Sequence, residues 1–417
     1  MLFSVGGCTC SETPEPTPDP VEPDPVEVEP EAEADPFVPV APDDERFSEN
    51  PRLLKRLVST PHGYYRFINI PFSEAVCERF GDDIRTMPTV NLHGDAHLEQ
   101  YTVTDVGTGL SDFDDSSSGP AILDIIRFGA SIRLAAMQHG WNDRWEAAFA
   151  NFLRGYRESL RDPEQERPTT AFSERVREGF HADRERFLEW ASGLMAPIED
   201  EEGFRDGYQR YRALMLEEHE DLSRTYFDMK QAGAFRMGVG SALDEKYLVR
   251  IEGPTDEPSD DLILEYKEVR DLSGISCIQG SEGGGAFRIL VSQSRIGDAP
   301  HRFLAQVPRG RRNPDGRPFW VHEWLANYKE LEVQESLESA DELDEIAHDT
   351  GRQLGRGHTQ AIAAPLDSQL RRAQLDSLLQ HEGEILAAVA DLSQRSMDGW
   401  NAFRENAPAP EEIEIPE

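Results

Sequence analysis

The spacing of apolar residues predicts a chain built mainly of helices. Apolar side chains recur every three or four positions over long stretches, which is the periodicity of an amphipathic helix. The predicted helices are Ile122 to His139, Trp145 to Leu160, Ser173 to about Met195, roughly 204 to 230, Ser339 to Ala363, and Leu366 to about Arg404, with a shorter one from Leu53 to Val58. The charged residues of these helices are expected to form solvated faces.

Between these helical stretches the pattern changes to one that is typical of strands. Segments 246–251, 262–267 and 319–322 alternate in polarity or concentrate β-branched and aromatic residues, as strands do. A short strand, a glycine-containing turn and the start of a second strand are predicted over 101–110. Helices on either side of a strand-rich segment predict an α+β fold.

Composition adds boundaries to this outline. Residues 11 to about 46 are dominated by proline, glutamate and aspartate. Such a segment cannot bury enough apolar surface to offset its ordering entropy, so we expect a disordered tail or linker there. The predicted division is a tail over 1–46, a helical lobe over 47–235, a β-rich lobe over 236–335, C-terminal helices that complete the helical lobe over 336–405, and a frayed tail over 406–417.

The charge of the chain limits its partners. The chain has 80 acidic and 42 basic residues and a formal net charge of -38, which argues against non-specific binding to nucleic acid. Anionic partners would be repelled unless a local cluster of basic residues meets them. No run of 18 apolar residues occurs, so no transmembrane helix is predicted. The oligomeric state is left open.

Four cysteines, Cys8, Cys10, Cys77 and Cys277, show no convincing zinc-ligand spacing. We interpret Cys77 and Cys277 as free thiols of a reducing compartment or as small buried apolar residues, and not as a disulfide framework. Residues 2–8 resemble the end of a bacterial lipoprotein signal, with Cys8 as the lipidated residue. Localisation therefore stays open between the cytoplasm and a membrane anchor at Cys8.

The candidate chemistry is concentrated in two neighbouring motifs. His93-Gly94-Asp95-Ala96-His97-Leu98-Glu99-Gln100 is followed a dozen residues later by Ser111-Asp112-Phe113-Asp114-Asp115. A strand–loop–strand hairpin would present Asp95 in its first loop and Asp112 at the end of the following strand. Phosphoryl transfer uses two carboxylates in this way, because one accepts the proton of the attacking hydroxyl and the other holds magnesium.

These two motifs resemble the catalytic and metal loops of aminoglycoside phosphotransferases and other protein-kinase-like enzymes. The longer run through Gly119-Pro120, Asp124, Arg127 and Ala130-Ser131 is closer still to bacterial domain-of-unknown-function family 2252, which is grouped with the kinase-like fold. The resemblance implies that Asp124 braces the catalytic loop from the start of a helix.

The same resemblance implies a role for each residue of the two motifs. Asp95 would be the catalytic base, and His93 and His97 would hold its loop in place. Asp112 would bind magnesium together with Asp114, and Gln100 stands where the usual metal-binding asparagine is found. The amide chemistry is retained there, but the carbonyl lies one methylene further out.

A second constellation resembles the nucleotide-binding part of the same family. Gly238, Gly240 and Ser241 would form the glycine-rich turn over the phosphates, because glycine lets backbone N–H groups approach them closely. Lys267 on a later strand would neutralise the phosphates. Since these parts follow the catalytic motifs instead of preceding them, the resemblance implies a bilobal, circularly permuted kinase-like fold.

Two further sets of residues receive weaker interpretations. Glu268 and Glu282 are candidates for the glutamate that pairs with the phosphate-binding lysine in kinases. Arg288 and Arg295 could serve a phosphate, and we interpret them as exposed helix residues.

We therefore expect an ATP-dependent phosphotransferase that uses Mg²⁺ and acts on a hydroxyl of a small-molecule or protein acceptor. A catalytically inactive nucleotide-binding relative or another nucleotide transferase is a first alternative, suggested by Gln100 and the unassigned helix glutamate. A metal-dependent hydrolase is a second alternative. Its ligands would be His93, Asp95, His97, Asp112 and Asp114.

Overall fold

The protein has a mixed α and β structure, as the sequence predicts. A computed structural model describes residues 35–180, 183–235, 244–279, 285–299, 301–309, 316–360 and 362–415. Within these ranges, ten strands form three antiparallel sheets and the other regular elements are helical. The α+β class is therefore confirmed.

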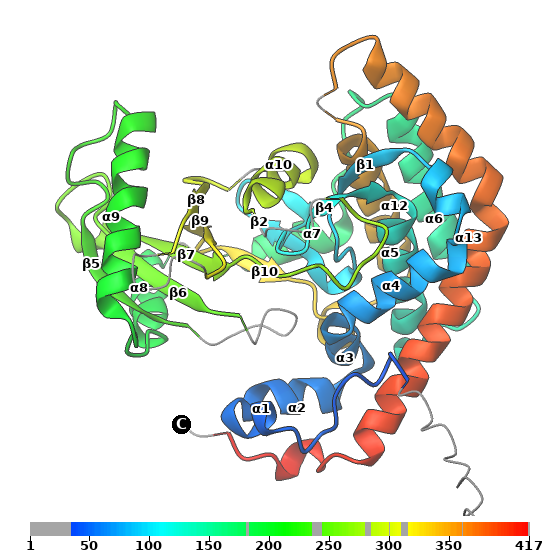
Figure 1. Cartoon of the computed structure of the whole chain (residues 1–417), viewed down its shortest axis with the longest axis horizontal. Helices are drawn as coiled ribbons and strands as arrows, with labels where there is room; N and C mark the ends of the chain where they lie inside the picture. The colour runs from blue at the N-terminus through cyan, green and yellow to red at the C-terminus, as the bar shows by residue number, and fades with distance from the viewer. Residues whose placement is uncertain are drawn as a thin grey trace, which may run out of the picture. The chain divides into compact units, whose positions relative to one another are not determined.

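Figure 1 shows how these elements follow one another along the chain. The helices are α1 (Glu45–Glu49), α2 (Pro51–Ser59), α3 (Pro61–Phe67), α4 (Asn69–Phe80), α5 (Ile122–His139), α6 (Trp145–Arg161), α7 (Ala171–Glu178), α8 (Arg184–Gly193), α9 (Glu201–Glu218), α10 (Phe287–Ile296), α11 (Val333–Ser336), α12 (Ala340–His358) and α13 (Leu366–Glu405), with 3-10 turns η1 (Asp83–Thr86), η2 (Leu98–Gln100), η3 (Pro258–Asp260) and η4 (Pro410–Glu412). The strands are β1 (Thr89–Leu92), β2 (Tyr101–Thr104), β3 (Thr108–Leu110), β4 (Ser117–Pro120), β5 (Met229–Ala234), β6 (Lys246–Ile251), β7 (Leu262–Glu268), β8 (Ala305–Val307), β9 (Phe319–Trp324) and β10 (Tyr328–Glu330).

Most of the predicted helices are confirmed, and two predicted stretches differ. The stretch predicted as one helix up to Met195 is two helices, α7 and α8, and the side chain of Asp183 caps α8 by accepting a hydrogen bond from the backbone N of Arg186. The helix predicted over 204–230 ends at Glu218. The residues of β5 then pair with β6, so sheet pairing overrides the local helical pattern there.

The helical part of the molecule is organised around α5, most of whose side chains are buried against α4, α6 and α13. Helices α6 and α12 also lie in close contact. A Cβ added at Gly351 would lie 2.0 Å from the carbonyl oxygen of Phe152, and one added at Gly355 would lie 2.4 Å from that of Tyr156. The glycines therefore let the two backbones touch, and this contact places the end of α12 beside the start of α5.

The five-stranded sheet has the order β5-β6-β7-β9-β8 and two different faces. One face is apolar: Val249, Leu264 and Tyr266 pack with Tyr208 and Tyr211 of α9 in one buried cluster, and Figure 1 shows α9 beside this sheet. Burial of each such side chain contributes about 1.5–3 kcal/mol to folding. The strands alternate between faces with period two, so the neighbours of these residues lie on the other face.

The opposite face of this sheet changes character along the strands. Leu248 and Ile263 pack against Leu188 of α8. Continuing along β7 on this face, Glu265 and Lys267 follow Ile263, and all three are buried. The polar end of the face is directed at the loop between β3 and β4, which carries the aspartate motif.

The two smaller sheets hold the predicted motifs in place. Strands β2 and β3 form the hairpin predicted over 101–110, and β10 extends it. Strand β1 leads into the histidine–aspartate motif and pairs with β4, which follows the aspartate motif. Among the described residues, no helix combines the length and hydrophobicity that crossing a bilayer requires.

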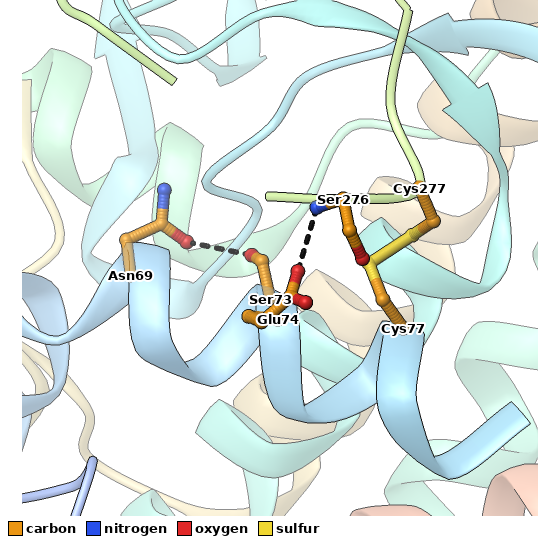
Figure 2. The surroundings of a disulfide bond; sticks show 6 residues. All are labelled: Asn69, Ser73, Glu74, Cys77, Ser276 and Cys277. Carbon is orange, nitrogen blue, oxygen red and sulfur yellow. Dashed lines mark hydrogen bonds between the residues drawn. A yellow bond between two sulfur atoms is a disulfide. The ribbon is translucent and has the colours of Figure 1, made fainter. Parts of the chain in front are cut away.

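The structure corrects the interpretation of two cysteines. Cys77 and Cys277 form a disulfide between α4 and the segment that follows β7, with their Cα atoms 5.6 Å apart (Figure 2). Their separation of 200 residues in the chain gives no hint of this pairing. Only the folded arrangement brings the two Cα atoms to a distance that a disulfide spans.

Candidate functional site

The histidine–aspartate loop that follows β1 is braced from two helices. Asp124 in the first turn of α5 accepts hydrogen bonds from the backbone N atoms of His93 and Gly94, at 2.7 and 2.9 Å. His358, the last residue of α12, lies 3.0 Å from the same carboxylate, and its other ring nitrogen bonds the hydroxyl of Tyr156. The bracing role predicted for Asp124 is therefore confirmed.

Gly94 allows this loop to touch the aspartate motif. Its φ of +87° is in the left-handed region, and an added Cβ would lie 1.8 Å from the carbonyl oxygen of Asp115. His93 makes a second link between the loops, because its Nε2 lies 2.9 Å from the carbonyl oxygen of Ser111 and its ring packs on that of Phe113. The two motifs form one unit, with His93 as a structural residue.

Asp95 is a buried carboxylate held by a buried arginine. Arg127 donates to Oδ1 of Asp95 from two nitrogens, at 2.9 and 2.7 Å, and its guanidinium lies over the ring of Tyr65. Burial raises the pKa of Asp95, but the Arg127 charge and the adjacent His97 outweigh burial and hold that pKa well below its usual range. Asp95 is thus ionised and in a fixed orientation.

His97 lies on the other side of Asp95. Its Nε2 is 3.5 Å from Oδ2 of Asp95, and neither ring nitrogen has a hydrogen-bond partner among the described residues. Burial lowers the pKa of His97 to about 4, although Asp95 acts in the opposite direction. His97 is therefore a neutral imidazole beside an ionised carboxylate at pH 7.

The aspartate motif is charge-paired with the sheet. The amine of Lys267 lies 2.5 Å from Oδ1 of Asp112 and 2.6 Å from Oδ2 of Asp114. The indole N–H of Trp320 donates to the other oxygen of Asp114, at 2.7 Å. Asp112 has a φ of 60°, a conformation that an aspartate adopts at a cost. The side-chain amide of Gln100 donates to Asp112 at 3.4 Å.

The two aspartates differ in their ionisation. Burial raises the pKa of Asp112, but the Lys267 ammonium outweighs it and holds that pKa well below its ordinary value. Burial and the nearby Asp112 charge raise the pKa of Asp114 to about 7. For Lys267, burial lowers the pKa and the two aspartates raise it well above its ordinary value. One ammonium thus neutralises a pair of carboxylates, of which one retains a proton near neutral pH.

Asp115, the last residue of the motif, is held from two sides. Its Oδ2 accepts a hydrogen bond from Asn69 at the start of α4, at 2.6 Å, and another from Arg270 after β7, also at 2.6 Å. Arg288 donates to the carbonyl oxygens of Asp114 and Ser116. The acidic motif is therefore a largely buried and charge-paired structure, in which Oδ1 of Asp115 has no hydrogen-bond partner among the described residues.

Two arginines interpreted as exposed helix residues are part of this framework. Arg288 is half-buried and bonds the backbone of the aspartate motif, and Arg295 donates to the side chain of Asn91 in β1, at 2.6 Å. Both belong to α10. The interpretation as exposed side chains was wrong, because α10 packs over β1 and β4 and its arginines reach carbonyl and amide oxygens there.

Lys246 is a site residue that the sequence pattern did not reveal. It lies directly across from Lys267 in the β6–β7 register and is buried on the same face of the sheet. Like charges at opposed positions, with Cβ atoms about 5 Å apart, disfavour the pairing. Burial and the neighbouring Lys267 lower the pKa of Lys246. Cross-strand register is invisible in a single strand's periodicity, so only the fold brings these lysines together.

The aromatic side of the same face was also missed. Trp320 lies across from Lys267 and His322 lies across from Glu265 in the β7–β9 register. The rings of Trp320 and His322 stack, and Nε2 of His322 is 3.2 Å from a carboxylate oxygen of Glu265. The predicted strand over 319–322 was the available signal, because its alternation places both rings on one face.

Several predicted residues are placed elsewhere or not described. Gly238, Gly240 and Ser241, the predicted glycine-rich turn, lie outside the described residues, as does Glu282. Glu268, a candidate partner of Lys267, instead pairs with Arg309 and Arg317. The partners of Lys267 in the described structure are aspartates of the second motif.

The donor atoms of the aspartate motif fit a hard divalent cation. The carboxylate oxygens of Asp112 and Asp114 are paired with Lys267, Trp320 and Gln100, so a cation would bind them by displacing the Lys267 amine. Oε1 of Gln100 is buried without a hydrogen-bond partner among the described residues. Magnesium is bound by oxygen ligands of this kind. The amide oxygen of Gln100 is thus available to a cation despite the longer side chain.

The alternative set of five metal ligands is less suited to a metal. Both ring nitrogens of His93 are engaged, with Ser111 and with the backbone N of Asp95, and Oδ1 of Asp95 is taken by Arg127. Within the described ranges, the one group of histidine and carboxylate ligand atoms that lie within 4.8 Å of one another is Asp83, His381 and Glu384, on η1 and α13. That group includes none of the predicted ligands.

A hollow of about 500 Å³ lies near the site, between α7, β10 and α11. Its lining includes Phe172, Arg175 and Tyr328 and none of the predicted site residues. The hydroxyl of Tyr328 lies 3.0 Å from that of Ser111, which precedes Asp112. One side chain therefore connects the wall of this hollow to the aspartate motif.

The fold and the site together define an α+β protein with a buried, charge-paired cluster of aspartates and lysines. The chain belongs to the family described as an uncharacterized protein conserved in bacteria (DUF2252), whose pattern matches residues 51–198 and 179–406. The two matched segments together cover most of the chain, so the predicted membership of family 2252 is confirmed, whereas the grouping with kinase-like enzymes stays a prediction. Comparisons with curated proteins and with solved structures found no match.

Proposed function

We propose that the protein is an ATP-dependent phosphotransferase with a kinase-like, circularly permuted arrangement of its parts. The observation that carries the proposal is the position of the Lys267 amine, 2.5 and 2.6 Å from Asp112 and Asp114. A lysine on a sheet beside an aspartate of a following loop is the pairing that kinase-like enzymes use to hold phosphates and their metal ion.

In this proposal Asp95 positions the acceptor hydroxyl. Arg127 keeps the carboxylate ionised and leaves Oδ2 as its less engaged oxygen. A low pKa makes Asp95 a weak base, and a weak base suffices because the transition state of phosphoryl transfer is loose and needs orientation more than early proton removal. The imidazole of His97, 3.5 Å from Oδ2, would help to hold this carboxylate in place.

Asp112, Asp114 and the amide oxygen of Gln100 would hold magnesium. The ion supplies charge neutralisation of the nucleotide phosphates when it is bound. Asp114 would bind it as the carboxylate, so its raised pKa makes nucleotide binding favour higher pH between about 6 and 8.

Lys267 and Lys246 would receive the phosphates. Two buried ammonium groups across one strand pair repel each other, and a polyanion between them removes that repulsion. The negative charge of the remaining surface would repel a nucleotide, so these two lysines would supply the local attraction. The glycine-rich segment 238–241 remains the predicted cover of the phosphates.

One observation favours a second candidate, an inactive protein that binds nucleotide. The two hydrogen bonds from Arg127 hold Asp95 in an orientation that is set by the protein alone. If these bonds persist when an acceptor binds, Asp95 has a structural role. The protein would then bind magnesium and nucleotide without turnover.

Calorimetric titration with ATP in the presence of Mg²⁺ or of a chelator tests both candidates. Three variants separate the roles: Asp95→Asn should bind Mg²⁺–ATP as the parent does, whereas Asp112→Asn and Lys267→Met should lose at least about tenfold in affinity. Asp105→Asn, an exposed carboxylate in the turn of the same hairpin, is the matched control.

Turnover is then measured by release or transfer of the labelled γ-phosphate. The parent should show magnesium-dependent transfer that Asp95→Asn abolishes. Binding without transfer in the parent would support the inactive candidate. Absence of magnesium-dependent binding in the parent, or equal loss in all variants including the control, would contradict both.

A further inference from the structure

The disulfide lies at one end of a contact between α4 and the segment 270–279, which we call the clamp segment. Along this contact, a Cβ added at Gly274 would lie 2.8 Å from a side-chain carbon of Ile70. The backbone N of Ser276 donates to the carboxylate of Glu74 at 2.6 Å, one residue before the disulfide (Figure 2). The clamp segment therefore lies against α4 over much of its length.

The other end of the same contact is Asp115. Asn69 at the start of α4 and Arg270 at the start of the clamp segment donate to one oxygen of Asp115, each at 2.6 Å. The backbone of Asp115 in turn touches Gly94 of the catalytic loop. The disulfide, about two turns along α4 from Asn69, thus closes a ring of contacts that passes through the site.

We propose that the Cys77–Cys277 disulfide is a thiol-exchange site for an external dithiol, and that its redox state controls how firmly Asp115 and Arg270 are held. Cys77 is 4% exposed and Cys277 is half-buried, and in this proposal Cys277 is the cysteine that an incoming thiolate attacks. Nothing in the proposed phosphoryl-transfer chemistry requires this bond, which acts on the position of the site and not on its reacting groups.

The exchange is a two-electron reduction of the protein by the dithiol. A thiolate of the dithiol attacks the sulfur of Cys277, a mixed disulfide forms, and Cys77 leaves as a thiolate that takes up a proton. The second thiol of the dithiol then attacks the first sulfur of the same dithiol, which is bonded to Cys277, and Cys277 is released as a thiol. The dithiol leaves as a cyclic disulfide. Disulfides persist in oxidising compartments and are reduced elsewhere, so the site would respond to its surroundings.

Reduction should loosen the clamp segment without unfolding the protein. The hydrogen bond from Ser276 to Glu74 and the bridge between Gln279 and Ser118 remain, but the covalent link no longer holds them together. Arg270 then spends more time away from Asp115. When the hydrogen bond from Arg270 to Asp115 is formed for less of the time, the histidine–aspartate loop that contacts Asp115 is held less firmly. An effect of this change on nucleotide affinity rests on the proposed function.

Hydrogen exchange of the full chain, oxidised and after reduction with dithiothreitol, tests the proposal directly. Backbone amides of the clamp segment, including Ser276 and Gln279, should exchange about tenfold faster or more after reduction, while those of the middle of α13 should not change. The Cys77→Ser/Cys277→Ser variant should exchange like the reduced parent in both conditions. A Cys8→Ser/Cys10→Ser variant, with the disulfide intact, should keep the full response.

Parallel titrations with Mg²⁺–ATP separate this inference from the proposed function. Weaker affinity after reduction, by about tenfold, would support both. Faster exchange of the clamp segment in a protein that binds no nucleotide in either state would support the clamp and contradict the phosphotransferase proposal. Unchanged exchange after reduction, or two free thiols at these positions in protein prepared under oxidising conditions, would overturn the clamp. If the serine variant does not fold, reduction of the folded parent gives the same readout.

Discussion

The amine of Lys267 lies 2.5 Å from a carboxylate oxygen of Asp112, although the two residues are 155 positions apart in the chain. The pair joins the five-stranded sheet to the loop that precedes β4. Lys267 is buried and Asp112 is partly buried, so removal of either charge would leave the other without its partner in a poorly solvated place. The contact therefore makes the stability of the fold and the chemistry of the site depend on the same side chains.

Replacement of this lysine should show that dependence. Lys267→Met leaves Asp112 and Asp114 buried without their cation, so the free energy of unfolding at pH 7 should fall by about 3 kcal/mol or more. Urea denaturation measures the change. Lys329→Met is the control: Lys329 pairs with Glu332 at the surface, where both side chains are nearly half-exposed, and its loss should cost less than about 1 kcal/mol. Similar losses in the two variants would contradict the buried pairing.

The raised pKa of Asp114 predicts a pH dependence. Because the folded-state pKa of about 7 lies above the ordinary value of 3.8, the folded state binds the proton more tightly than the unfolded state does. The contribution of Asp114 to stability is therefore present at low pH and is lost as pH rises from about 4 to about 7. The Asp114→Asn variant lacks this titration. Its free energy of unfolding minus that of the parent should increase over this range and level off above it, and a difference that is constant with pH would refute the assignment.

Alanine substitutions at two glycines should distinguish the cost of backbone strain from the cost of steric contact. Gly94 and Gly140 both have φ in the left-handed region, +87° and +72°, but only Gly94 faces another backbone, with the Asp115 carbonyl oxygen 1.8 Å from an added Cβ. Gly140→Ala should therefore cost about 1–2 kcal/mol for conformation alone. Gly94→Ala should cost at least about 2 kcal/mol more, or prevent folding, because two loops must separate. Thermal and urea unfolding of both variants measure the difference, and equal costs would show that the loops adjust freely.

The hydrogen bonds by which Asp124 holds the histidine–aspartate loop should behave as a buried polar network. In the parent, the two carboxylate oxygens of Asp124 accept from the backbone N–H groups of His93 and Gly94. Asp124→Asn keeps the shape of the side chain but replaces one of these acceptors with an amide N–H₂, which is a donor. A loss of about 2–3 kcal/mol in the free energy of unfolding is expected. Asp398→Asn, exposed on α13, should have little effect. A small effect in both variants would mean that His358 and water replace the lost acceptor.

Local sequence signals were sufficient where the cause of structure is local. The apolar spacing from Ile122 to His139 corresponds to α5, and the alternation over 101–110 corresponds to the β2–β3 hairpin. The single helix predicted up to Met195 failed because Asp183 starts a second helix, α8. The helix predicted up to residue 230 ends at Glu218, and the last two residues of the predicted stretch belong to β5, whose pairing with β6 no local pattern records.

The candidate site divides in the same way. Asp95 and Asp112 could be predicted as site residues from the sequence, because both belong to one short stretch with a recognisable order of loops and strands. Lys246 was not marked, because its relation to Lys267 is a matter of cross-strand register. The framework role of Arg288 was not marked either, since it depends on a helix packing over strands distant in the chain.

By itself, the sequence determined the main helices and strands, the two acidic loops and the family, because each of these depends on residues that are close together in the chain. Only the tertiary structure decided that Cys77 bonds Cys277 and that His358 contacts the carboxylate of Asp124. It also decided that Lys267 pairs with Asp112 and lies across from Lys246 on the neighbouring strand. The physical reason is that these contacts join segments whose separation in the chain carries no information about their distance. Their geometry is set by the packing of apolar faces elsewhere in the molecule, and the site takes its shape from that packing.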